Sequence, residues 1–427
     1  MSVKAVYASI LTIGDELLIG QTIDTNSAWM AQELNRIGIW VRRRVAVGDV
    51  RRDIWQALDE ELRESDIVLL TGGLGPTADD ITKPLLADYF GGRLVMDEAT
   101  RKHVQQIFKQ LGRTLLERNL RQAEVPDCCE VLPNKRGTAP GMWFTPAAVA
   151  GRGTRVVVSM PGVPFEMRGI MRDSVLPRLK QTFQLPLILH RTLLTAGAGE
   201  SFIAERLEPW EQTLPPHIKL AYLPNYGMVR LRLTATGSNQ HTLQQELDYL
   251  FAELQQGVED ILVIAEDLPL EQALGNLLQQ QGRTVATAES CTGGYLAHLL
   301  TSLPGASAWY LGSVVAYDNA VKTNLLQVQP TTLNTSGAVS EATVQEMLLG
   351  VLNHTGASYG IATSGIMGPD GGTAGKPVGT VWVAAGSREK METRMFRYRF
   401  DRVRNIQLAA AHALLLLLRR VQEDHPA

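Results

Sequence analysis

The stretch RTVATAESCTGGYLAHLLTSL, residues 283–303, decides the fold class of this chain. Its first part, RTVATAE, is an apolar run typical of a buried strand. Its last part, GGYLAHLLTSL, combines two glycines with leucines at helical spacing. A strand, a glycine turn and a helix in succession form the repeating unit of an α/β domain. The turn also gathers Glu289, Ser290, Cys291 and Thr292, which packing alone does not explain.

The same order of elements continues on both sides of this stretch. Further strands are predicted towards the C-terminus at GSVVAYDN, YGIATSGIMG and PVGTVWVAAG, followed by a closing helix at VRNIQLAAAHALLLLLRRVQ. Near the N-terminus, strands are predicted at AVYASILTIG, DIVLLTGGLG and RVVVSMPGVP, and a helix capped by Asn26 or Ser27 at TNSAWMAQELNRIG. Both halves therefore predict parallel sheets covered by helices on both faces, with ligands bound beyond the carboxyl ends of the strands.

The segment between these halves has a different pattern. MVRLRLTATG alternates apolar and charged residues with a period of two, which predicts an antiparallel or half-exposed sheet. The whole chain is therefore predicted to be an α/β protein in which a small α+β domain joins two α/β sandwich domains. The predicted boundaries are 1–169, 170–262 and 263–427.

Composition limits the possible partners and compartment. The chain has 427 residues, 45% hydrophobic and 20% charged, with a formal net charge of −3. This balance gives no basic surface for nucleic acid. Three cysteines without a CxxC spacing indicate a reducing compartment, so we expect a cytoplasmic protein. The longest late apolar run, LAAAHALLLLL, is too short to cross a bilayer, so we expect no membrane association.

Ser290 is the first candidate for catalysis, because it falls where the strand ends and the helix begins. Such a junction exposes backbone N–H groups and the positive end of a helix dipole, which can stabilise an oxyanion during attack on a carbonyl. A serine needs a base. Lys322 lies about one turn into a helix predicted to be capped by Asp318 or Asn319, and a desolvated lysine can accept the proton.

The pattern leaves other roles open. A serine before a helix is commonly an N-cap, and a lysine in a first helical turn is commonly solvated. Cys291 is a rival nucleophile because the same dipole would activate a thiol, although buried inert cysteines are more common. The segment TSGIMGPDGG, residues 363–372, predicts a loop that offers N–H groups to a phosphate or an oxyanion.

Five motifs in the last 160 or so residues closely resemble the C-terminal domain of the CinA (competence/damage-inducible protein) family: TAESCTGG, GSVVAYDNAVKTNLLQV, GAVSEATVQEM, SGIMGPDGG and KPVGTVWVA. The resemblance implies a deamidase that converts nicotinamide mononucleotide to nicotinate mononucleotide and ammonia without a cofactor. It implies Ser290 as the nucleophile, assisted by Lys322 and Tyr317. Met367 departs from the family, which usually has alanine there. The implied substrate contacts are Gly293, Gly294, Ser364, Gly365, Gly368, Arg402 and Arg404.

The N-terminal half carries a second cluster of polar residues. TGGLGPTADD is a glycine loop after a strand, and Asp79 and Asp80 follow it. The segments GDE and DTN add further oxygen donors on loops at the same predicted sheet edge. Hard oxygen ligands beside a phosphate-cradling loop suit a divalent cation that bridges to phosphates. Alternatively, these acids are helix caps and turn residues.

This half resembles the molybdopterin-binding fold in the version fused to CinA, through GDELLIGQTIDTNSAWMAQEL, TGGLGPTADDITKPLLADYFG, MPGVPFEM and TAGAGES. The resemblance implies an ADP-ribose pyrophosphatase that releases AMP and ribose 5-phosphate with a divalent metal ion, optionally with a monovalent cation. The middle segment resembles the family's KH-like domain. The expected substrate contacts are Gly72, Gly73, Gly75 and Asn26. The expected metal ligands are Asp15, Glu16, Asp79 and Asp80.

These resemblances predict a bifunctional pyridine-nucleotide recycling enzyme whose partners are nicotinamide mononucleotide and ADP-ribose. One alternative is a pterin- or nucleotide-binding protein without turnover. Another is a competence-related interaction protein. We also expect a homodimer, because VRLRLTATG and the helix at 406–418 suggest more apolar surface than one small domain can bury, and because the family forms dimers.

Overall fold

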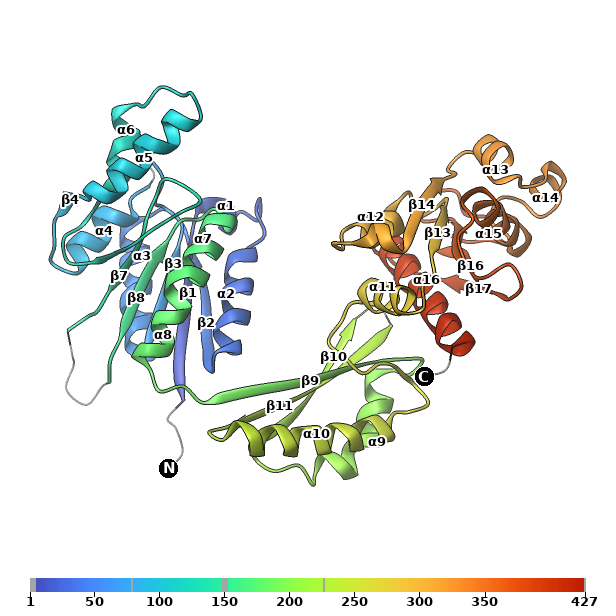
Figure 1. Ribbon diagram of the computed structural model, residues 1–427, viewed down its shortest axis with the longest axis horizontal. Helices are drawn as coiled ribbons and strands as arrows, with labels where there is room; N and C mark the ends of the chain where they lie inside the picture. Colours follow the sequence, from blue (N-terminus) through green and yellow to red (C-terminus); the bar gives the residue numbers. More distant parts are fainter. Residues whose placement is uncertain (1–4, 78–79, 148–152, 226, 426–427) are drawn as a thin grey trace. The chain divides into compact units, whose positions relative to one another are not determined.

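The hydrophobic strands of the N-terminal half form a six-stranded mixed sheet in the computed structural model, which describes residues 5–77, 80–147, 153–225 and 227–425 (Figure 1). Strands β2, β1, β3 and β8 run parallel, and β7 and β6 continue the sheet antiparallel to them. In spatial order the strands are β2 (Ile39–Val47), β1 (Val6–Ile13), β3 (Ile67–Thr71), β8 (Val156–Met160), β7 (Gly141–Phe144) and β6 (Glu130–Leu132).

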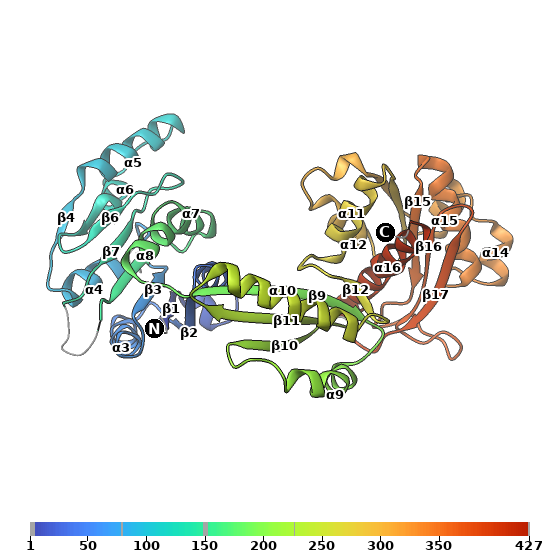
Figure 2. The ribbon, with the colours of Figure 1, turned by 60° about the horizontal axis from the view of Figure 1, so that its bottom comes forward.

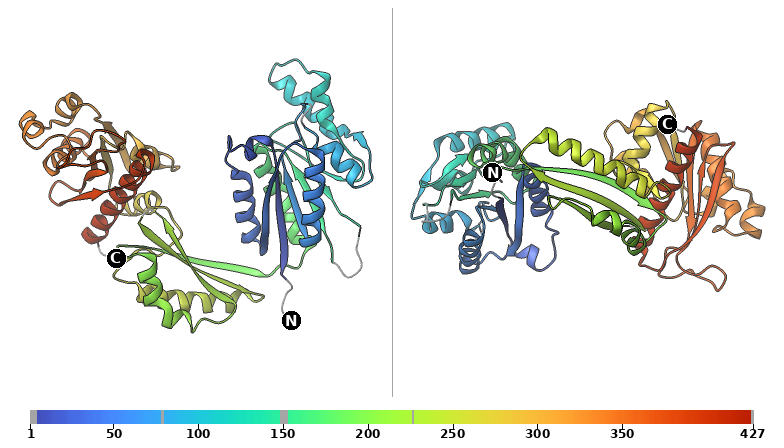
Figure 3. Two further views of the ribbon diagram at one scale, coloured as in Figure 1. Left: turned by 180° about the vertical axis from the view of Figure 1, so that it is seen from behind. Right: turned by 90° about the horizontal axis from the view of Figure 1, so that it is seen from below.

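Helices cover both faces of this sheet (Figure 3). Helices α2, α7 and α8 pack on one face, and α3 and α4 pack on the other. The elements are α1 (Asp15–Leu18), α2 (Thr25–Arg36), α3 (Arg51–Glu64), α4 (Thr82–Tyr89), α5 (Glu98–Gln110), α6 (Glu117–Leu120), α7 (Pro164–Ile170), α8 (Leu176–Thr182) and the two-stranded pair β4 (Leu94–Met96) and β5 (Glu124–Pro126), with single turns at Arg121–Ala123 and Met171–Val175.

The predicted cap of α2 is wrong by two or three residues. Asp24, rather than Asn26 or Ser27, is the N-cap, and its carboxylate accepts a hydrogen bond from the N–H of Ser27 at 2.9 Å. A carboxylate placed before the first helical residue reaches the free N–H groups of that turn, whereas Asn26 is already inside the helix.

The middle region forms a four-stranded sheet in the order β10 (Ile218–Asn225), β11 (Met228–Gly237), β9 (Leu187–Ala196), β12 (Leu262–Ile264), accompanied by α9 (Glu200–Glu211) and α10 (Gln240–Gly257). Along β11, Leu231 and Leu233 are buried while Arg230 and Arg232 are half-buried, so the predicted alternation is confirmed. The chain divides into two compact units, Met1–His190 with Pro216–Ile218 and Thr234–Asp248, and Arg191–Pro215 with Lys219–Leu233 and Tyr249–Ala427.

The C-terminal region forms a five-stranded sheet in the order β14 (Tyr310–Val315), β13 (Val285–Glu289), β15 (Tyr359–Gly365), β16 (Thr380–Gly386), β17 (Met391–Arg397). Alternate residues of β13 serve different layers. Val285 belongs to the core under α11, α12 and α16, while Ala286 and Ala288 face α13 and α15. Helices α11 and α16 lie on one side of the sheet, and α15 lies on the other (Figure 2). The helices are α11 (Leu270–Gln280), α12 (Tyr295–Thr301), α13 (Asn319–Leu326), α14 (Pro330–Thr335), α15 (Glu341–Thr355) and α16 (Arg402–Asp424), with a single turn at Ala306–Ala308.

The prediction of purely parallel sheets is wrong for both halves. In the C-terminal sheet β14, β13 and β15 are parallel, but β16 and β17 are antiparallel to their neighbours. For β16 and β17 the reason is connection length, since parallel neighbours need a crossover of about a dozen residues or more, whereas only residues 387–390 separate these two strands. Among the described helices, none is both long enough and apolar enough to cross a membrane.

Candidate active site

Ser290 lies at the carboxyl end of the central strand β13. Its backbone N–H donates to the carbonyl of Thr363 at 2.9 Å, which ties it to the end of β15. On the other side, the N–H of Ala316 donates to the carbonyl of Glu289 at 2.7 Å, which places Ser290 beside the end of β14. The side chain is 9% exposed, and within the described chain its Oγ makes no hydrogen bond. The hydroxyl is therefore available to a substrate.

Lys322 is held at the same edge of the sheet. Its helix, α13, is capped by Asp318, whose carboxylate accepts from the N–H of Ala320 at 2.7 Å. The Lys322 side chain is 1% exposed, and Nζ donates to the carbonyls of Ala316 at 2.8 Å and Tyr317 at 3.1 Å. An uncharged amine has two N–H donors and one lone pair, so these two carbonyls account for both donors. Burial lowers the pKa of Lys322, which favours that uncharged form.

Ser290 and Lys322 thus share one corner of the site without a direct bond. The carbonyl that anchors Lys322 belongs to Ala316, the residue that pairs with the strand end at Glu289. No hydrogen bond joins Ser290 Oγ to Lys322 Nζ among the described residues. Catalytic hydrogen bonds are often long before substrate binds and tighten in the complex.

Tyr317 and Arg402 meet at the rim of this corner. The Tyr317 ring is 63% exposed, and its hydroxyl accepts a hydrogen bond from Arg402 Nη2 at 2.9 Å. Arg402 Nη1 donates to the carbonyl of Gly368 at 2.8 Å. One guanidinium therefore links the loop after β14 to the glycine loop after β15, and a guanidinium has further N–H donors for a ligand. Arg404 lies one half-turn on, and its N–H donates to Asp401 at the cap of α16.

The end of β15 and the glycine loop after it are closely packed. The predicted loop 363–372 begins only after Gly365, because residues 363–365 still belong to the strand. Ser364 is 1% exposed, and its hydroxyl donates to the carbonyl of Ala338 at 2.6 Å. A Cβ on Gly365 would lie 2.7 Å from Val381 Cγ2, so this glycine permits the approach of β16. Gly368 has φ +86° and close contact with Val378. Met367, the departure from the family pattern, is 3% exposed and packs into the hydrophobic core.

The two glycines after Ser290 have different surroundings from that loop. Gly293 has φ +61°, and a Cβ there would meet no atom within 4 Å. Gly294 has φ +95°, and a Cβ there would lie 3.6 Å from Val315 Cγ2. Both therefore serve the left-handed conformation of the turn, and Gly293 also leaves open space beside it.

Cys291 differs clearly from its neighbour Ser290. It is 4% exposed and belongs to the hydrophobic core that includes Leu296 and Met367. Burial raises the pKa of the Cys291 thiol to about 12, so the nucleophilic thiolate is disfavoured at neutral pH. These surroundings favour an inert structural cysteine over the rival nucleophile.

Glu289 occupies the N–H groups at the start of α12, which the sequence predicted to be exposed at this junction. The carboxylate of this fully buried residue accepts hydrogen bonds from the N–H groups of Gly294, Leu296 and Ala297, at 3.0, 3.0 and 2.8 Å. The first N–H groups of α12 are therefore occupied and are not exposed to a substrate. The acidic residue stood in the opening motif, but no local pattern showed where its carboxylate would point.

Asn405 is another residue that sequence reasoning missed. It is fully buried in α16, and its Nδ2 donates to the carbonyls of Met367 at 3.1 Å and Phe400 at 2.9 Å. These bonds fix the glycine loop against the start of α16, where Arg402 lies. The residues that it joins lie far apart in sequence, so no motif reveals the brace.

In the N-terminal unit, the glycine loop opens onto a cavity of about 490 Å³ at the carboxyl ends of the parallel strands. Of the predicted residues, the cavity is lined by Glu16, Gly72, Gly73, Gly75 and Asp80. Sequence reasoning missed four further polar residues that line it, Asp49, Gln122, Thr138 and Glu166. Burial raises the pKa of Glu166, which also accepts a hydrogen bond from Asn134 Nδ2 at 2.7 Å.

The predicted metal ligands Asp80 and Asp15 accept hydrogen bonds from backbone N–H groups. Both oxygens of Asp80 accept from the loop, from the N–H of Gly75 at 2.6 Å and the N–H of Thr77 at 2.8 Å. Asp15 Oδ1 accepts from the N–H of Asp49 at 3.1 Å. Asp79 lies outside the described residues. Asn26 Nδ2 donates to the carbonyl of Gly162 at 2.7 Å.

The chemistry of these donors suits a hard cation. Among the residues that the structure describes, no three His, Cys, Asp or Glu side chains are grouped closely enough to hold a metal ion. One predicted ligand, Asp79, lies outside those residues, and the ligand set stays a prediction.

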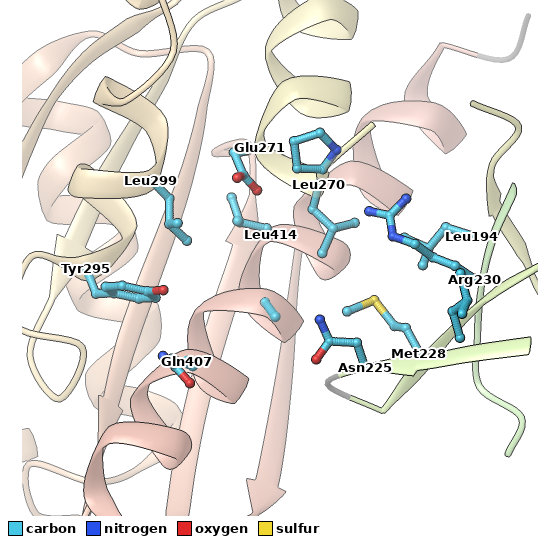
Figure 4. Close-up of a pocket in the computed structure, with 13 residues that line it drawn as sticks. Leu194, Asn225, Met228, Arg230, Leu270, Glu271, Tyr295, Leu299, Gln407 and Leu414 are labelled. Atoms are coloured by element: carbon cyan, nitrogen blue, oxygen red, sulfur yellow. The ribbon is translucent and has the colours of Figure 1, made fainter. Parts of the chain in front are cut away.

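A separate cavity of about 200 Å³ in the C-terminal unit is lined in part by α11, α12 and α16 (Figure 4). Tyr295 and Leu299 of α12, Gln407 and Leu414 of α16, and Glu271 of α11 contribute to its walls. Helices α12 and α16 both begin at the loops around Ser290 and Arg402, but neither of those residues lines this cavity.

Three protein-family models match the chain. A model described as "Probable molybdopterin binding domain" matches residues 9–181. The model "Damage-inducible protein CinA KH domain" matches residues 190–262, and the model "CinA C-terminal domain" matches residues 267–421. Their order and nature agree with the predicted fold class of two α/β domains around a KH-like domain.

Whole-length relatives carry the same combination. A CinA-like protein of Cytophaga hutchinsonii is 48% identical over 425 residues, which cover 98% of this chain and 99% of that protein. A CinA-like protein of Flavobacterium psychrophilum is 40% identical, with 98% and 99% covered. A crystal structure of a CinA superfamily protein from Klebsiella pneumoniae is 40% identical and covers 36% of this chain and 96% of its own, with a TM-score of 0.35.

Proposed function

The chain belongs to the CinA family, and from that premise we propose that its C-terminal domain hydrolyses the carboxamide of nicotinamide mononucleotide to nicotinate mononucleotide and ammonia. The observation that carries the proposal is the buried amine of Lys322. Its Nζ donates to the carbonyls of Ala316 at 2.8 Å and Tyr317 at 3.1 Å, which hold the amine near the strand end that carries Ser290. A buried amine with both N–H groups occupied suits a general base.

In the first step, Ser290 Oγ attacks the carboxamide carbon while Lys322 Nζ accepts the hydroxyl proton. A bond forms between Oγ and the carbon, and the carbonyl electron pair moves onto oxygen to give a tetrahedral oxyanion. The backbone N–H groups of Cys291 and Thr292 follow the nucleophile in the turn. Among the described residues, neither N–H donates to a backbone carbonyl, so both can donate to the oxyanion.

In the second step, the oxyanion collapses, the bond between carbon and nitrogen breaks, and the ammonium of Lys322 returns its proton to the departing nitrogen. Ammonia leaves, and the acyl group remains as an ester of Ser290. A water molecule then attacks the ester carbon and gives a proton to Lys322, which passes it to Ser290 Oγ as the acid is released.

The rim of the site supplies positive charge for the phosphate of the substrate. Arg402 uses two nitrogen atoms to hold Tyr317 and the carbonyl of Gly368, and its fork geometry suits a phosphate in addition. Because Arg402 joins the two loops, a phosphate bound to it would position the nucleotide relative to Ser290.

The test is ammonia release by the unmodified protein from a panel of carboxamides. Nicotinamide mononucleotide should release ammonia with formation of nicotinate mononucleotide. Nicotinamide riboside, which lacks the phosphate, and NAD should react more slowly. Ammonia release from none of the panel would contradict the proposal and favour a nucleotide-binding protein without turnover or a competence-related interaction protein.

We further propose that the N-terminal cavity binds ADP-ribose and hydrolyses its pyrophosphate to AMP and ribose 5-phosphate. The supporting observation is a glycine loop that opens onto a cavity with a half-buried carboxyl, Glu166, whose raised pKa suits a proton donor to the departing phosphate. Water supplies the oxygen that bonds to phosphorus as the bridging bond breaks.

AMP release from ADP-ribose, assayed with Mg²⁺ or Mn²⁺ present, tests this second proposal. Glu166→Gln should lower AMP release and leave ammonia release unchanged. If the unmodified protein releases no AMP from ADP-ribose with either metal ion, that result would favour the pterin-binding alternative.

A further inference from the structure

Glu289 is a buried carboxylate that the proposed reaction does not use. It is the last residue of β13 and 0% exposed, directly before Ser290. Its Oε2 accepts from the hydroxyl of Thr292 at 2.7 Å and from the N–H groups of Gly294 and Leu296, both at 3.0 Å. Its Oε1 accepts from the N–H of Ala297 at 2.8 Å.

These bonds enclose the turn that carries Ser290. The carboxylate belongs to the residue before the turn, and its donors belong to the turn and to the first residues of α12 after it. The carboxylate and α12 therefore hold both ends of the segment 290–293. No ion pair of the described residues includes Glu289, so the helix N–H groups and hydroxyls are what stabilise its charge.

The arrangement of the turn keeps the Cys291 thiol away from the position of Ser290 Oγ. Neighbouring residues in a turn point in different directions, and Cys291 is directed into the core while Ser290 Oγ has no protein partner. The charge of Glu289 also contributes to the raised pKa of the Cys291 thiol, after the larger effect of burial. The same carboxylate thus fixes the turn and disfavours ionisation of the neighbouring thiol.

We propose that Glu289 is a positioning residue whose carboxylate clamps the turn 290–293 against α12 and thereby presents Ser290, and not Cys291, to the substrate. The inference rests on the proposed deamidation for its role in catalysis. Its structural content, the choice between the two side chains, does not depend on the identity of the substrate.

Glu289→Gln is the most conservative test, because it keeps the shape but replaces one acceptor oxygen by an N–H₂ group. That group would face at least one obligate N–H donor, since both oxygens accept from backbone. We expect kcat for deamidation to fall on the order of a hundredfold with little change in KM, as for other displacements of reacting groups. Alkylation of the peptide containing Cys291 by iodoacetamide should become faster.

A matched control is Glu346→Gln. Glu346 also accepts from a helix start, from the N–H of Gln329 at 2.8 Å and the hydroxyl of Thr332 at 2.6 Å, but it serves α14. This variant should leave kcat and Cys291 alkylation within twofold of the unmodified protein. If Glu289→Gln does not fold, Thr292→Val removes one donor of the clamp and should give the same two changes to a smaller extent.

A fluorophosphonate probe, which labels reactive serines without any nucleotide, separates this inference from the proposed function. Labelling of Ser290 should slow in Glu289→Gln even if nicotinamide mononucleotide proves not to be the substrate. Unchanged labelling, unchanged Cys291 alkylation and unchanged kcat in Glu289→Gln and Thr292→Val would overturn the clamp. Equal losses in Glu346→Gln would also overturn it, by showing a general loss of stability.

Discussion

Lys322 combines full burial with two short hydrogen bonds to backbone carbonyls, and this combination determines how it can act on Ser290. The sequence predicted the pair of residues from the strand end and the helix start, and the cap at Asp318 is confirmed. The sequence could not predict the role of Glu289, because that role depends on how the turn after β13 and the start of α12 direct their N–H groups. Ser364 shows the same limit, since its bond to the Ala338 carbonyl joins segments 26 residues apart.

The pH dependence of deamidation should report Lys322. Burial lowers the pKa of this amine from its ordinary value of 10.5, and only the uncharged form can accept the serine proton. We therefore expect kcat/KM for nicotinamide mononucleotide to rise with pH, to level off once the amine is deprotonated, and to have its midpoint below 10.5. A profile that falls through this range would contradict the role of Lys322 as base.

The control for this profile is Lys322→Arg, whose guanidinium carries a permanent positive charge because it cannot deprotonate in a protein. Activity should fall on the order of a thousandfold, and the rising limb should disappear. Retention of both would show that the base is another group.

Arg402 should affect the nucleotide more than the chemistry. Arg402→Gln removes a cation at the rim but leaves Ser290 and Lys322 in place. We expect KM for nicotinamide mononucleotide to rise roughly tenfold, as for loss of one charged hydrogen bond of about 1.5 kcal/mol. Kinetics with nicotinamide riboside are the control, because that substrate has no phosphate and its KM should change little.

At the scale of elements, strand and helix segments follow from local pattern, but their pairing does not. The apolar runs predicted β13, β15 and β16, and the long apolar helix near the C-terminus is α16. The direction of β16 and β17 depended on loop length rather than on the strands themselves. The brace at Asn405 joins the glycine loop to α16 and has no signal in either segment.

The contact between α15 and α13 is a test of how packing positions Lys322. A Cβ on Gly350 of α15 would lie 2.0 Å from the carbonyl oxygen of Leu326, the last residue of α13. Gly350→Ala should therefore displace α13, lower the free energy of unfolding by about 1–3 kcal/mol and reduce kcat for deamidation. Thermal unfolding and steady-state kinetics measure the two effects.

Gly275→Ala separates displacement of α13 from general destabilisation. A Cβ on Gly275 of α11 would lie 2.6 Å from the ring of Trp309, away from α13. This variant should be destabilised to a similar degree while kcat at a temperature below unfolding stays close to that of the unmodified protein. Similar loss of kcat in both variants would contradict a specific role of the α15–α13 contact.

At the scale of the whole molecule, the chain combines two candidate sites in two compact units. The proposed reactions both act on breakdown products of pyridine nucleotides. The order of the three family domains could be predicted because the N-terminal and C-terminal domains each carry several motifs, and the segment between them has a different pattern. The residues that line the N-terminal cavity could not be predicted in the same way. Asp80 and Asp15 accept hydrogen bonds from nearby backbone N–H groups. Glu166 lines the cavity, but its motif, MPGVPFEM, gave no sign of a role in binding.

The homodimer stays a prediction, and the apolar residues that suggested it in the sequence do not require a second chain. Leu231 and Leu233 of β11 and Leu414 and Leu417 of α16 are buried within the chain itself, so they need no second copy to cover them. Static light scattering at micromolar concentration should nevertheless give twice the mass of the chain, as the family resemblance implies. The mass of a single chain would rule the dimer out.

The most direct test of the account is ammonia release from nicotinamide mononucleotide by two neighbouring variants, Ser290→Ala and Cys291→Ala, under identical conditions. Since a nucleophile and its base act as one unit, Ser290→Ala should lose activity by on the order of a thousandfold or more. Cys291→Ala should retain most of it, because its thiol is buried and its pKa is raised to about 12. An inactive Cys291→Ala beside a Ser290→Ala that still releases ammonia would contradict the assignment and identify a cysteine amidase.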